Sequence, residues 1–198
     1  MASFSDKLIF ASHREPESSV QGKTKPWKIL IVDDEVEVHQ LTVLILSDLE
    51  YANRGVEFLH AYSAAEGIAL VAEHPDLAII LLDVVMESQH SGLEMVEHIR
   101  AHLSNRLVRI ILRTGQPGQA PERDVILNYD INDYKEKTDL TANKLFSSVV
   151  TALRGYADLT ALEKNRIGLE QIIAASKSLY DQQSLSQFFT GILTQIEA

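Results

Sequence analysis

Short, almost wholly apolar runs alternate with helical patterns along this sequence, and that alternation constrains the fold more than any other feature. The first run, residues 29–32, stops abruptly at Asp33, and another, residues 77–82, stops at Asp83. Runs that are apolar on both faces are typical of buried parallel strands. Between the runs, apolar residues recur every three or four positions, as in amphipathic helices. Strands are expected at 29–32, 56–62, 77–82, 107–112 and 131–135, and helices at 36–49, 64–73, 92–103, 122–128 and from about 140.

This order of elements predicts an α/β fold, a five-stranded parallel sheet with helices on both faces and right-handed crossovers. The helix at 64–73 has a start signal of its own, because Ser63 can cap it and Glu66 stands at the capping-box position. In such sheets, ligands bind beyond the carboxyl ends of the strands. Functional side chains are therefore expected where the strands end.

Composition narrows the function classes. The formal net charge of −10 argues against direct, nonspecific nucleic-acid binding, which depends on Lys and Arg. The absence of cysteine excludes a disulfide scaffold, a thiolate zinc site and a cysteine nucleophile. The longest apolar run, residues 78–82, is far shorter than the ~20 residues of a membrane helix. Residues 1–10 lack a signal-peptide pattern, so we expect a cytoplasmic protein without a membrane partner.

Three regions are expected. Residues 1–26 are polar and aperiodic and are expected to form an N-terminal tail. Residues 27–156 are expected to form the α/β domain. Residues 157–198 are expected to form a linker helix and the start of a truncated second domain. The helical pattern is expected to break at Gln183 and Ser184, before a second amphipathic helix at 185–196. A narrow apolar seam at 159–173 is interrupted by Arg166, which leaves a coiled-coil homodimer open.

Five polar side chains are expected to meet at the carboxyl edge of the sheet: Asp33, Asp34, Asp83, Thr114 and Lys137. Three carboxylates at close range repel one another by about 1–4 kcal/mol per pair, and a hard divalent cation such as Mg²⁺ relieves this repulsion. A hydroxyl and an ammonium opposite the acids suit the oxygens of a phosphoryl group. A carboxylate can itself be the nucleophile and form an acyl phosphate, and the central position of Asp83 suits that role.

Four motifs in this order are similar to those of one family. They are the acid pair after the first strand (29–35), the strand ending in Asp83 (81–86) with Gly92, the segment 112–115 and the segment 133–137. Over residues 27–156 the chain resembles the receiver domain of two-component response regulators. The resemblance implies a flavodoxin-like fold with strand order 2-1-3-4-5.

The resemblance also implies the roles of the site residues. Asp83 would accept a phosphoryl group from a sensor histidine kinase or a phosphotransfer protein and pass the change to a C-terminal output domain. Magnesium would be held by Asp33, Asp34, Asp83 and the backbone carbonyl of Val85. Thr114 and Lys137 would bind the phosphoryl oxygens, and Tyr134 would be the aromatic switch that turns inward with Thr114. Such a chain is a phosphoacceptor regulator, with only self-phosphorylation and slow self-dephosphorylation as chemistry.

Some positions depart from the family pattern. Glu87 and Thr138 stand where the family usually has proline, and the loop from Asp83 to Gly92 is one residue longer. Arg113 adds a second cation beside Thr114, and its partner, Glu87 or phosphate, stays open. Residues 113–122 and 132–138 resemble a subgroup whose receiver precedes a GAF-like domain and sometimes an HD-GYP phosphodiesterase, and residues 169–197 resemble the opening helices of that middle domain.

Two other function classes remain as alternatives. A Mg²⁺-dependent phosphohydrolase with an aspartate nucleophile would carry a second acid two residues on, where this chain has Val85. A phosphorylation-independent scaffold would not need the acid pair. Glu94, His98 and His102 share a helix face with zinc-compatible spacing, although such faces are usually solvated. No phosphate-binding glycine motif supports nucleotide binding.

Overall fold

The computed structural model describes residues 25–115, 131–137 and 141–196, with side chains up to residue 177. Its centre is one parallel sheet of five strands in the order β2-β1-β3-β4-β5, which confirms the predicted α/β class and strand order. The strands are β1 (Trp27–Val32), β2 (Val56–Ala61), β3 (Leu77–Asp83), β4 (Arg109–Thr114) and β5 (Asp133–Glu136).

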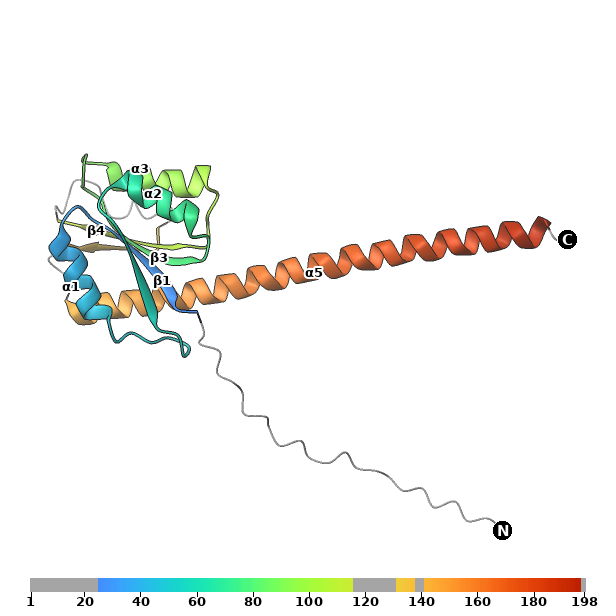
Figure 1. Cartoon of the computed structure of the whole chain (residues 1–198), viewed down its shortest axis with the longest axis horizontal. Coiled ribbons are helices and arrows are strands. Elements are labelled where there is room, and N and C mark those ends of the chain that lie inside the picture. The colour runs from blue at the N-terminus through green and yellow to red at the C-terminus, as the bar shows by residue number, and fades with distance from the viewer. Residues whose placement is uncertain (1–24, 116–130, 138–140, 197–198) are drawn as a thin grey trace, which may run out of the picture.

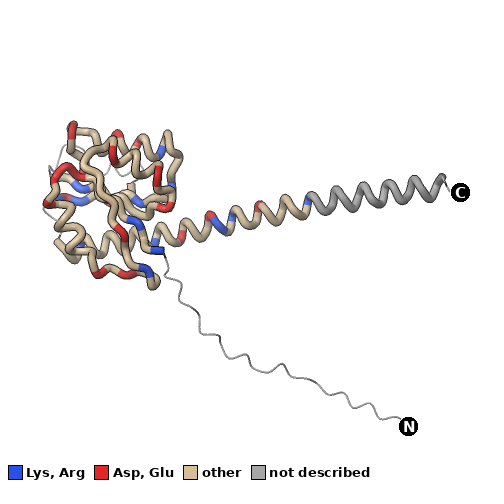
Figure 2. Tube along the Cα trace, in the orientation of Figure 1, with Lys and Arg blue, Asp and Glu red and all other residues tan. Residues whose placement is uncertain are grey.

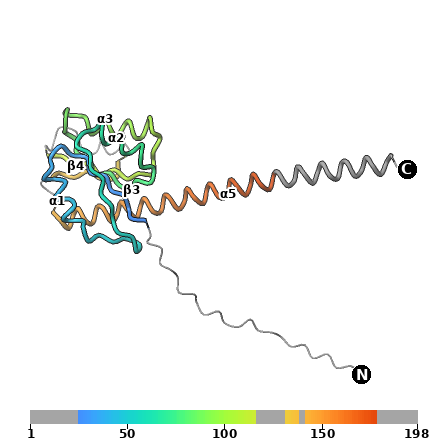
Figure 3. The backbone as a smooth tube through the Cα atoms, viewed as in Figure 1, coloured from blue at the N-terminus to red at the C-terminus, as the bar shows by residue number. Residues whose placement is uncertain are grey.

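Helices cover both faces of this sheet (Figure 1). α1 (Val36–Leu46) and α5 (Ala142–Ile196) lie on one face, and α2 (Ala64–Glu73), α3 (Ser91–Glu97) and the π-helix η1 (His98–His102) lie on the other. The backbone trace in Figure 3 shows the same layers, with the sheet between them. Every neighbouring pair of strands is parallel, so all the carboxyl ends lie at one edge.

The alternation of side chains along each strand divides the core in two. In β1, Leu30 and Val32 pack in the cluster under α2 and α3, whereas Ile29 and Ile31 pack in the cluster under α1 and α5. This follows from the two-residue period of a strand. β3 is central and buried along its whole length, which explains its uninterrupted apolar sequence up to Asp83.

α2 begins as its sequence predicts. The Ser63 hydroxyl accepts a hydrogen bond from the Glu66 amide at 3.2 Å, and the Glu66 carboxylate accepts one from the Tyr62 amide at 2.8 Å. The predicted range of this helix, 64–73, is confirmed. The two caps together satisfy amides at the helix start that have no partner within the helix.

The predicted break at Gln183 and Ser184 is wrong. α5 is one continuous helix to Ile196 and extends far beyond the sheet, as Figure 1 shows. The helix contains no proline, Gln is a good helix former, and the propensity cost of one serine is only a few tenths of a kcal/mol. A polar pair therefore does not end a helix without a capping residue or proline.

Several element boundaries also differ from the predictions. The helix expected at 92–103 is α-helical only to Glu97 and then widens into η1. The strand expected at 107–112 starts at Arg109, because the Asn105 side chain accepts hydrogen bonds from the amides of Leu107 and Val108 and holds them in a turn. The first helix ends at Leu46, and the last strand spans Asp133–Glu136. The expected tail (1–26, apart from its last two residues) and helix 122–128 lie outside the described residues.

The structure shows where the charged residues lie and whether any described helix could span a membrane. Acidic positions are spread over the sheet and the helices that cover it, and both acidic and basic positions occur along the described part of α5 (Figure 2). Within the described residues, no helix is both long enough and apolar enough to cross a membrane.

Candidate functional site

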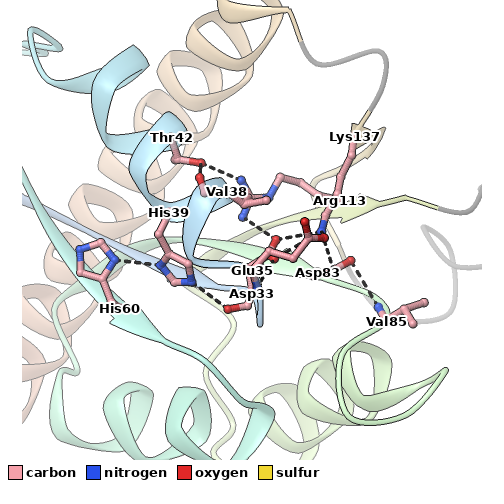
Figure 4. Close-up of polar contacts among 10 residues, drawn as sticks. All are labelled: Asp33, Glu35, Val38, His39, Thr42, His60, Asp83, Val85, Arg113 and Lys137. Carbon is pink, nitrogen blue, oxygen red and sulfur yellow. Dashed lines mark hydrogen bonds and ion pairs between the residues drawn. The ribbon is translucent and has the colours of Figure 1, made fainter.

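The carboxyl edge of the sheet brings two of the predicted acids, Asp33 and Asp83, together with the predicted lysine (Figure 4). The Lys137 ammonium lies 2.8 Å from Asp83 Oδ2 and 3.2 Å from Asp33 Oδ2. Asp33 follows β1, Asp83 is the last residue of β3, and Lys137 follows β5. One cation therefore joins two carboxylates that are 50 positions apart in the sequence.

A second acidic group adjoins this pair. One carboxylate oxygen from each of Asp33, Asp34 and Glu35 lies within 4.8 Å of the others. Asp33 is fully buried, whereas Asp34 and Glu35 are exposed. Glu35 also reaches Lys137 at 3.0 Å and was not among the predicted site residues. Its position directly after the acid pair was the available signal.

Oxygen donors of this kind fit magnesium. Mg²⁺ prefers hard oxygen ligands and binds through few carboxylates while keeping several waters, which suits a cluster that is buried on one side and open on the other. Asp83 is not part of the 4.8 Å group and is linked to it through Lys137. The chain therefore has a donor set for Mg²⁺ next to the predicted phosphoacceptor.

Burial and charge act in opposite directions on the acceptor and its lysine. Burial raises the pKa of the Asp83 carboxyl, and the Lys137 ammonium opposes this rise without cancelling it. Burial alone would lower the pKa of Lys137, but hydrogen bonds and charge from Asp83, Glu35 and Asp33 outweigh it and raise the pKa. Lys137 therefore stays protonated while it faces the acids.

The backbone after β3 is held close to Asp83. The Val85 amide donates to Asp83 Oδ1 at 3.3 Å, and the Gly92 amide donates to the Val84 carbonyl at 3.2 Å. A Cβ at position 92 would stand 2.1 Å from the Asp83 carbonyl oxygen, so this close approach requires glycine. Gly92 thus lets α3 start against the strand end that carries Asp83.

Glu87 has a local structural role where the family usually has proline. Its Oε1 accepts a hydrogen bond from the Ala64 amide at 2.8 Å, at the first residue of α2. A carboxylate there satisfies a free helix amide and interacts favourably with the helix dipole. Glu87 therefore ties the loop after Asp83 to the neighbouring helix, and it is not the partner of Arg113.

The partners of Arg113 are Asp33 and Thr42. Its Nη2 lies 3.4 Å from Asp33 Oδ2, and its Nη1 donates to Thr42 Oγ1 at 2.9 Å. These contacts answer the question that the sequence left open, as far as the described residues go. Asp33 thus faces two cations, Lys137 and Arg113, both visible in Figure 4.

His39 is a further residue that sequence reasoning missed. This buried side chain on α1 has Nε2 2.8 Å from the Asp33 carbonyl oxygen and Nδ1 2.9 Å from Nδ1 of His60. Because a carbonyl only accepts, Nε2 must carry a proton. His39 therefore holds the backbone of Asp33 from the helix that follows it.

Thr114 and Tyr134 lie on the other side of β4 and β5. Thr114 is buried. Tyr134 is 7% exposed and packs in the same core cluster as Leu112. The ring is thus already turned inward in this structure. The coupled movement of Thr114 and Tyr134 stays a prediction.

The alternative zinc face on η1 gains no support. Among the described residues, the group of three or more acids or imidazoles that meets within 4.8 Å is Asp33, Asp34 and Glu35, and Glu94, His98 and His102 do not form one. The His98 and His102 rings contact each other instead, with centroids 5.0 Å apart. Thr138 lies outside the described residues.

Comparison with known proteins places the chain in a family. The family described as "Response regulator receiver domain" matches residues 29–149, more than half of the chain. The chain belongs to the response regulator receiver family. A second family, "Domain of unknown function (DUF3369)", matches residues 149–198 of this receiver chain.

This receiver chain is also similar to a much longer protein. It is 44% identical over 182 residues to the 3'3'-cGAMP-specific phosphodiesterase 2 of Vibrio cholerae serotype O1. The match covers 92% of the chain and 35% of that relative. The chain therefore spans about a third of the relative's length.

Solved receivers share its fold. The CheY-like receiver domain protein of Methanospirillum hungatei JF-1 is 25% identical, with a TM-score of 0.52, over 67% of this chain and 98% of that one. The signal receiver domain of an HD domain-containing protein from Pseudomonas fluorescens Pf-5 has a TM-score of 0.56 at 20% identity, over 67% and 98% of the two chains. At that identity the second match shows the fold alone, which is the flavodoxin-like arrangement predicted from the motifs.

Proposed function

We propose that this receiver is a phosphoacceptor switch in a two-component phosphorelay and that Asp83 takes the phosphoryl group. The observation that carries the proposal is the contact of one ammonium, Lys137, with both Asp83 and Asp33, beside the acidic cluster. A lysine in this position can interact with the Asp83 carboxylate before the transfer and with the negatively charged phosphoryl oxygens after it.

In the proposed reaction, an Asp83 carboxylate oxygen bonds to phosphorus while the bond between phosphorus and a donor histidine nitrogen breaks. The electron pair of that bond returns to the imidazole, which takes a proton from water. Lys137 and Thr114 would bind the phosphoryl oxygens. Mg²⁺, held by Asp33, Asp34, Asp83 and the Val85 carbonyl, with Glu35 nearby, would neutralise the charge that repels an incoming phosphoryl group.

The same geometry suggests how the change leaves the site. Thr114 ends β4, Tyr134 is on the neighbouring strand β5, and α5 follows β5 in the sequence. A shift of Thr114 toward the phosphoryl oxygens would change the packing around the buried Tyr134 ring on β5, the strand from which the chain continues into α5. The phosphoryl group would select this second arrangement because it binds that arrangement better.

We propose the domain limits predicted from the sequence, with 27–156 as the receiver and 157–198 as a linker helix and the start of a second domain. The two family matches, which meet at residue 149, support a change of domain within α5. The relative's name supports a phosphodiesterase as output, an activity for which this chain offers no predicted site. The receiver itself would act as a regulator and not as an enzyme with turnover.

The proposed partners are a sensor histidine kinase or a phosphotransfer protein, in the cytoplasm. Exposed apolar side chains on α1, the helix that directly follows the acidic cluster, support a protein partner. Val36 and Leu44 are among them. The net charge of −10 disfavours direct nucleic-acid contact. The exposed apolar residues of α5 keep a homodimer as an open proposal.

Binding of beryllofluoride, a phosphoryl mimic, tests the proposal. With Mg²⁺ it should raise the melting temperature of the chain, and Asp83→Asn should abolish the shift. Asp76→Asn is the matched control, because Asp76 pairs with Lys28 at the opposite edge of the sheet and should leave the shift intact.

Two other outcomes would favour the rival classes. Repeated release of phosphate from a small phosphodonor, over many turnovers, would identify a phosphohydrolase. The absence of any shift in the unmodified chain would identify a scaffold that keeps only the fold.

A further inference from the structure

The buried guanidinium of Arg113 is the part of the acid pocket that the proposed phosphoryl transfer does not use. Its side chain is 3% exposed and lies on the α1 side of β4, whereas the next residue, Thr114, faces the other side. Its Nε is buried and has no hydrogen-bond partner among the described residues. A buried cation with an unsatisfied donor is costly, so its position needs an explanation.

Two contacts fix the guanidinium against the pocket. Thr42 Oγ1 donates to the Val38 carbonyl at 2.6 Å, which leaves its lone pairs free to accept from Arg113 Nη1 at 2.9 Å. The other end of the fork, Nη2, reaches Asp33 Oδ2 at 3.4 Å. Helix α1 thus anchors one side of Arg113 and directs its charge at a carboxylate of the acidic cluster.

We propose that Arg113 is a positioning residue whose guanidinium partly neutralises the Asp33 carboxylate, with which Mg²⁺ would also interact. Arg113 thereby weakens the binding of Mg²⁺ before Asp83 is phosphorylated. This inference rests on the proposed magnesium site. A guanidinium stays protonated in proteins, so its charge at Asp33 is permanent. Phosphorylation of Asp83 adds negative charge to the pocket, which offsets Arg113 and makes tight binding of the metal conditional on the phosphoryl group.

The expected size follows from Coulomb's law. A unit charge a few ångströms from a divalent ion interacts strongly even at an effective dielectric of about 20, and salt screens a buried charge only weakly. Replacing Arg113 with a neutral side chain of similar length should therefore tighten Mg²⁺ binding at least about tenfold. A purely structural role predicts the opposite sign, because a loosened pocket holds a metal less well.

Calorimetric titration of the full chain with MgCl₂, without phosphodonor, tests the proposal. Arg113→Met and Arg113→Gln should lower the Kd for Mg²⁺, whereas Arg113→Lys keeps the charge and should stay within about threefold of the unmodified chain. Arg109→Met is the matched control, because Arg109 is on the same face at the other end of β4 and bonds to Leu107 and Arg106 carbonyls. Circular dichroism confirms that each variant is folded.

A further variant, Thr42→Ala, changes the setting of the guanidinium without changing any charge. Thr42→Ala removes the second partner of the guanidinium, which can then turn both ends of its fork to Asp33. This variant should bind Mg²⁺ more weakly than the unmodified chain. A loosened pocket would also weaken binding, so this variant serves to refute the proposal: tighter binding would overturn it even if neither neutral variant folds, and alanine favours the helix.

The outcomes separate this inference from the proposed function. Suppose that the unmodified chain binds Mg²⁺. If Arg113→Met and Arg113→Gln then bind Mg²⁺ with the same or lower affinity, or if Thr42→Ala binds it with higher affinity, the role of Arg113 alone is overturned. If neither the unmodified chain nor any variant binds Mg²⁺, both the magnesium site and this inference are overturned.

Discussion

Two parts of α5 have similar apolar patterns but very different surroundings. Near its start, Leu153 and Tyr156 are buried in the cluster with Trp27. Farther along, Leu169 and Ile173 are 61% and 68% exposed. We call the described residues 25–157 the body and residues 158–177 the arm. The comparison shows that an apolar helical pattern predicts a helix, but not whether a partner surface covers it.

Truncation of a leucine in each region should give the largest contrast. Leu153→Ala should lower the free energy of unfolding by about 2–5 kcal/mol, because it removes fully buried methyl groups and leaves a cavity. Leu169→Ala should change it by less than about 0.5 kcal/mol in dilute solution. Urea unfolding measures both. A large loss for Leu169→Ala that grows with protein concentration would show that the arm is covered by another copy.

A glycine in each region should respond in opposite directions. Gly92→Ala should cost about 3 kcal/mol, because the added Cβ meets the backbone at Asp83 and Val84. Gly168→Ala should stabilise the arm by up to about 1 kcal/mol, because nothing lies within 4 Å and alanine favours the helix. Thermal melts compare the two. A mild effect of Gly92→Ala would mean that α3 does not start as close to Asp83 as described.

A carboxylate in each region makes a finer contrast. Glu87→Ala should cost about 1 kcal/mol through loss of the hydrogen bond to the Ala64 amide, and Glu87→Gln should retain part of it. In the arm, Glu163 pairs with Arg166 at the surface, with the two side chains 38% and 54% exposed, and Glu163→Gln should not measurably change the melting temperature. Equal effects at the two positions would contradict the cap on α2.

The smallest effect should depend on pH. Burial raises the pKa of Asp83, so the folded protein binds this proton more tightly than the unfolded chain, and ionisation of Asp83 costs stability. That cost appears as pH rises above the ordinary value of 3.8 and is complete above the raised pKa. Asp83→Asn should therefore be more stable than the unmodified chain at pH 7, and the difference should fade as pH approaches 3.8. A gain that is constant with pH would contradict this origin.

The body was largely predictable from the sequence because its signals are local and redundant. The apolar run before Asp83 is typical of a buried strand, and Ser63 and Glu66 mark the start of α2. The meeting of Asp33, Asp83 and Lys137 followed from the shared edge of a parallel sheet.

What escaped prediction depends on contacts between distant residues. Nothing local indicates that Arg113 faces Thr42 across 71 positions or that Glu87 caps a helix 23 residues before it. Nothing in the local sequence indicates that His39 of α1 hydrogen-bonds the Asp33 carbonyl. The continuation of α5 past Ser184 was missed because a polar pair, Gln183 and Ser184, was taken as a helix stop although neither residue ends a helix.

Location of the phosphoryl group on the chain tests the central claim most directly. The chain is incubated with Mg²⁺ and a small phosphodonor, the acyl phosphate is trapped by borohydride reduction, and the peptides are mapped by mass spectrometry. The account predicts one modified residue, Asp83, and no modification when Mg²⁺ is chelated. Modification of Asp33, Asp34 or another residue in place of Asp83, or none with Mg²⁺ present, would contradict it.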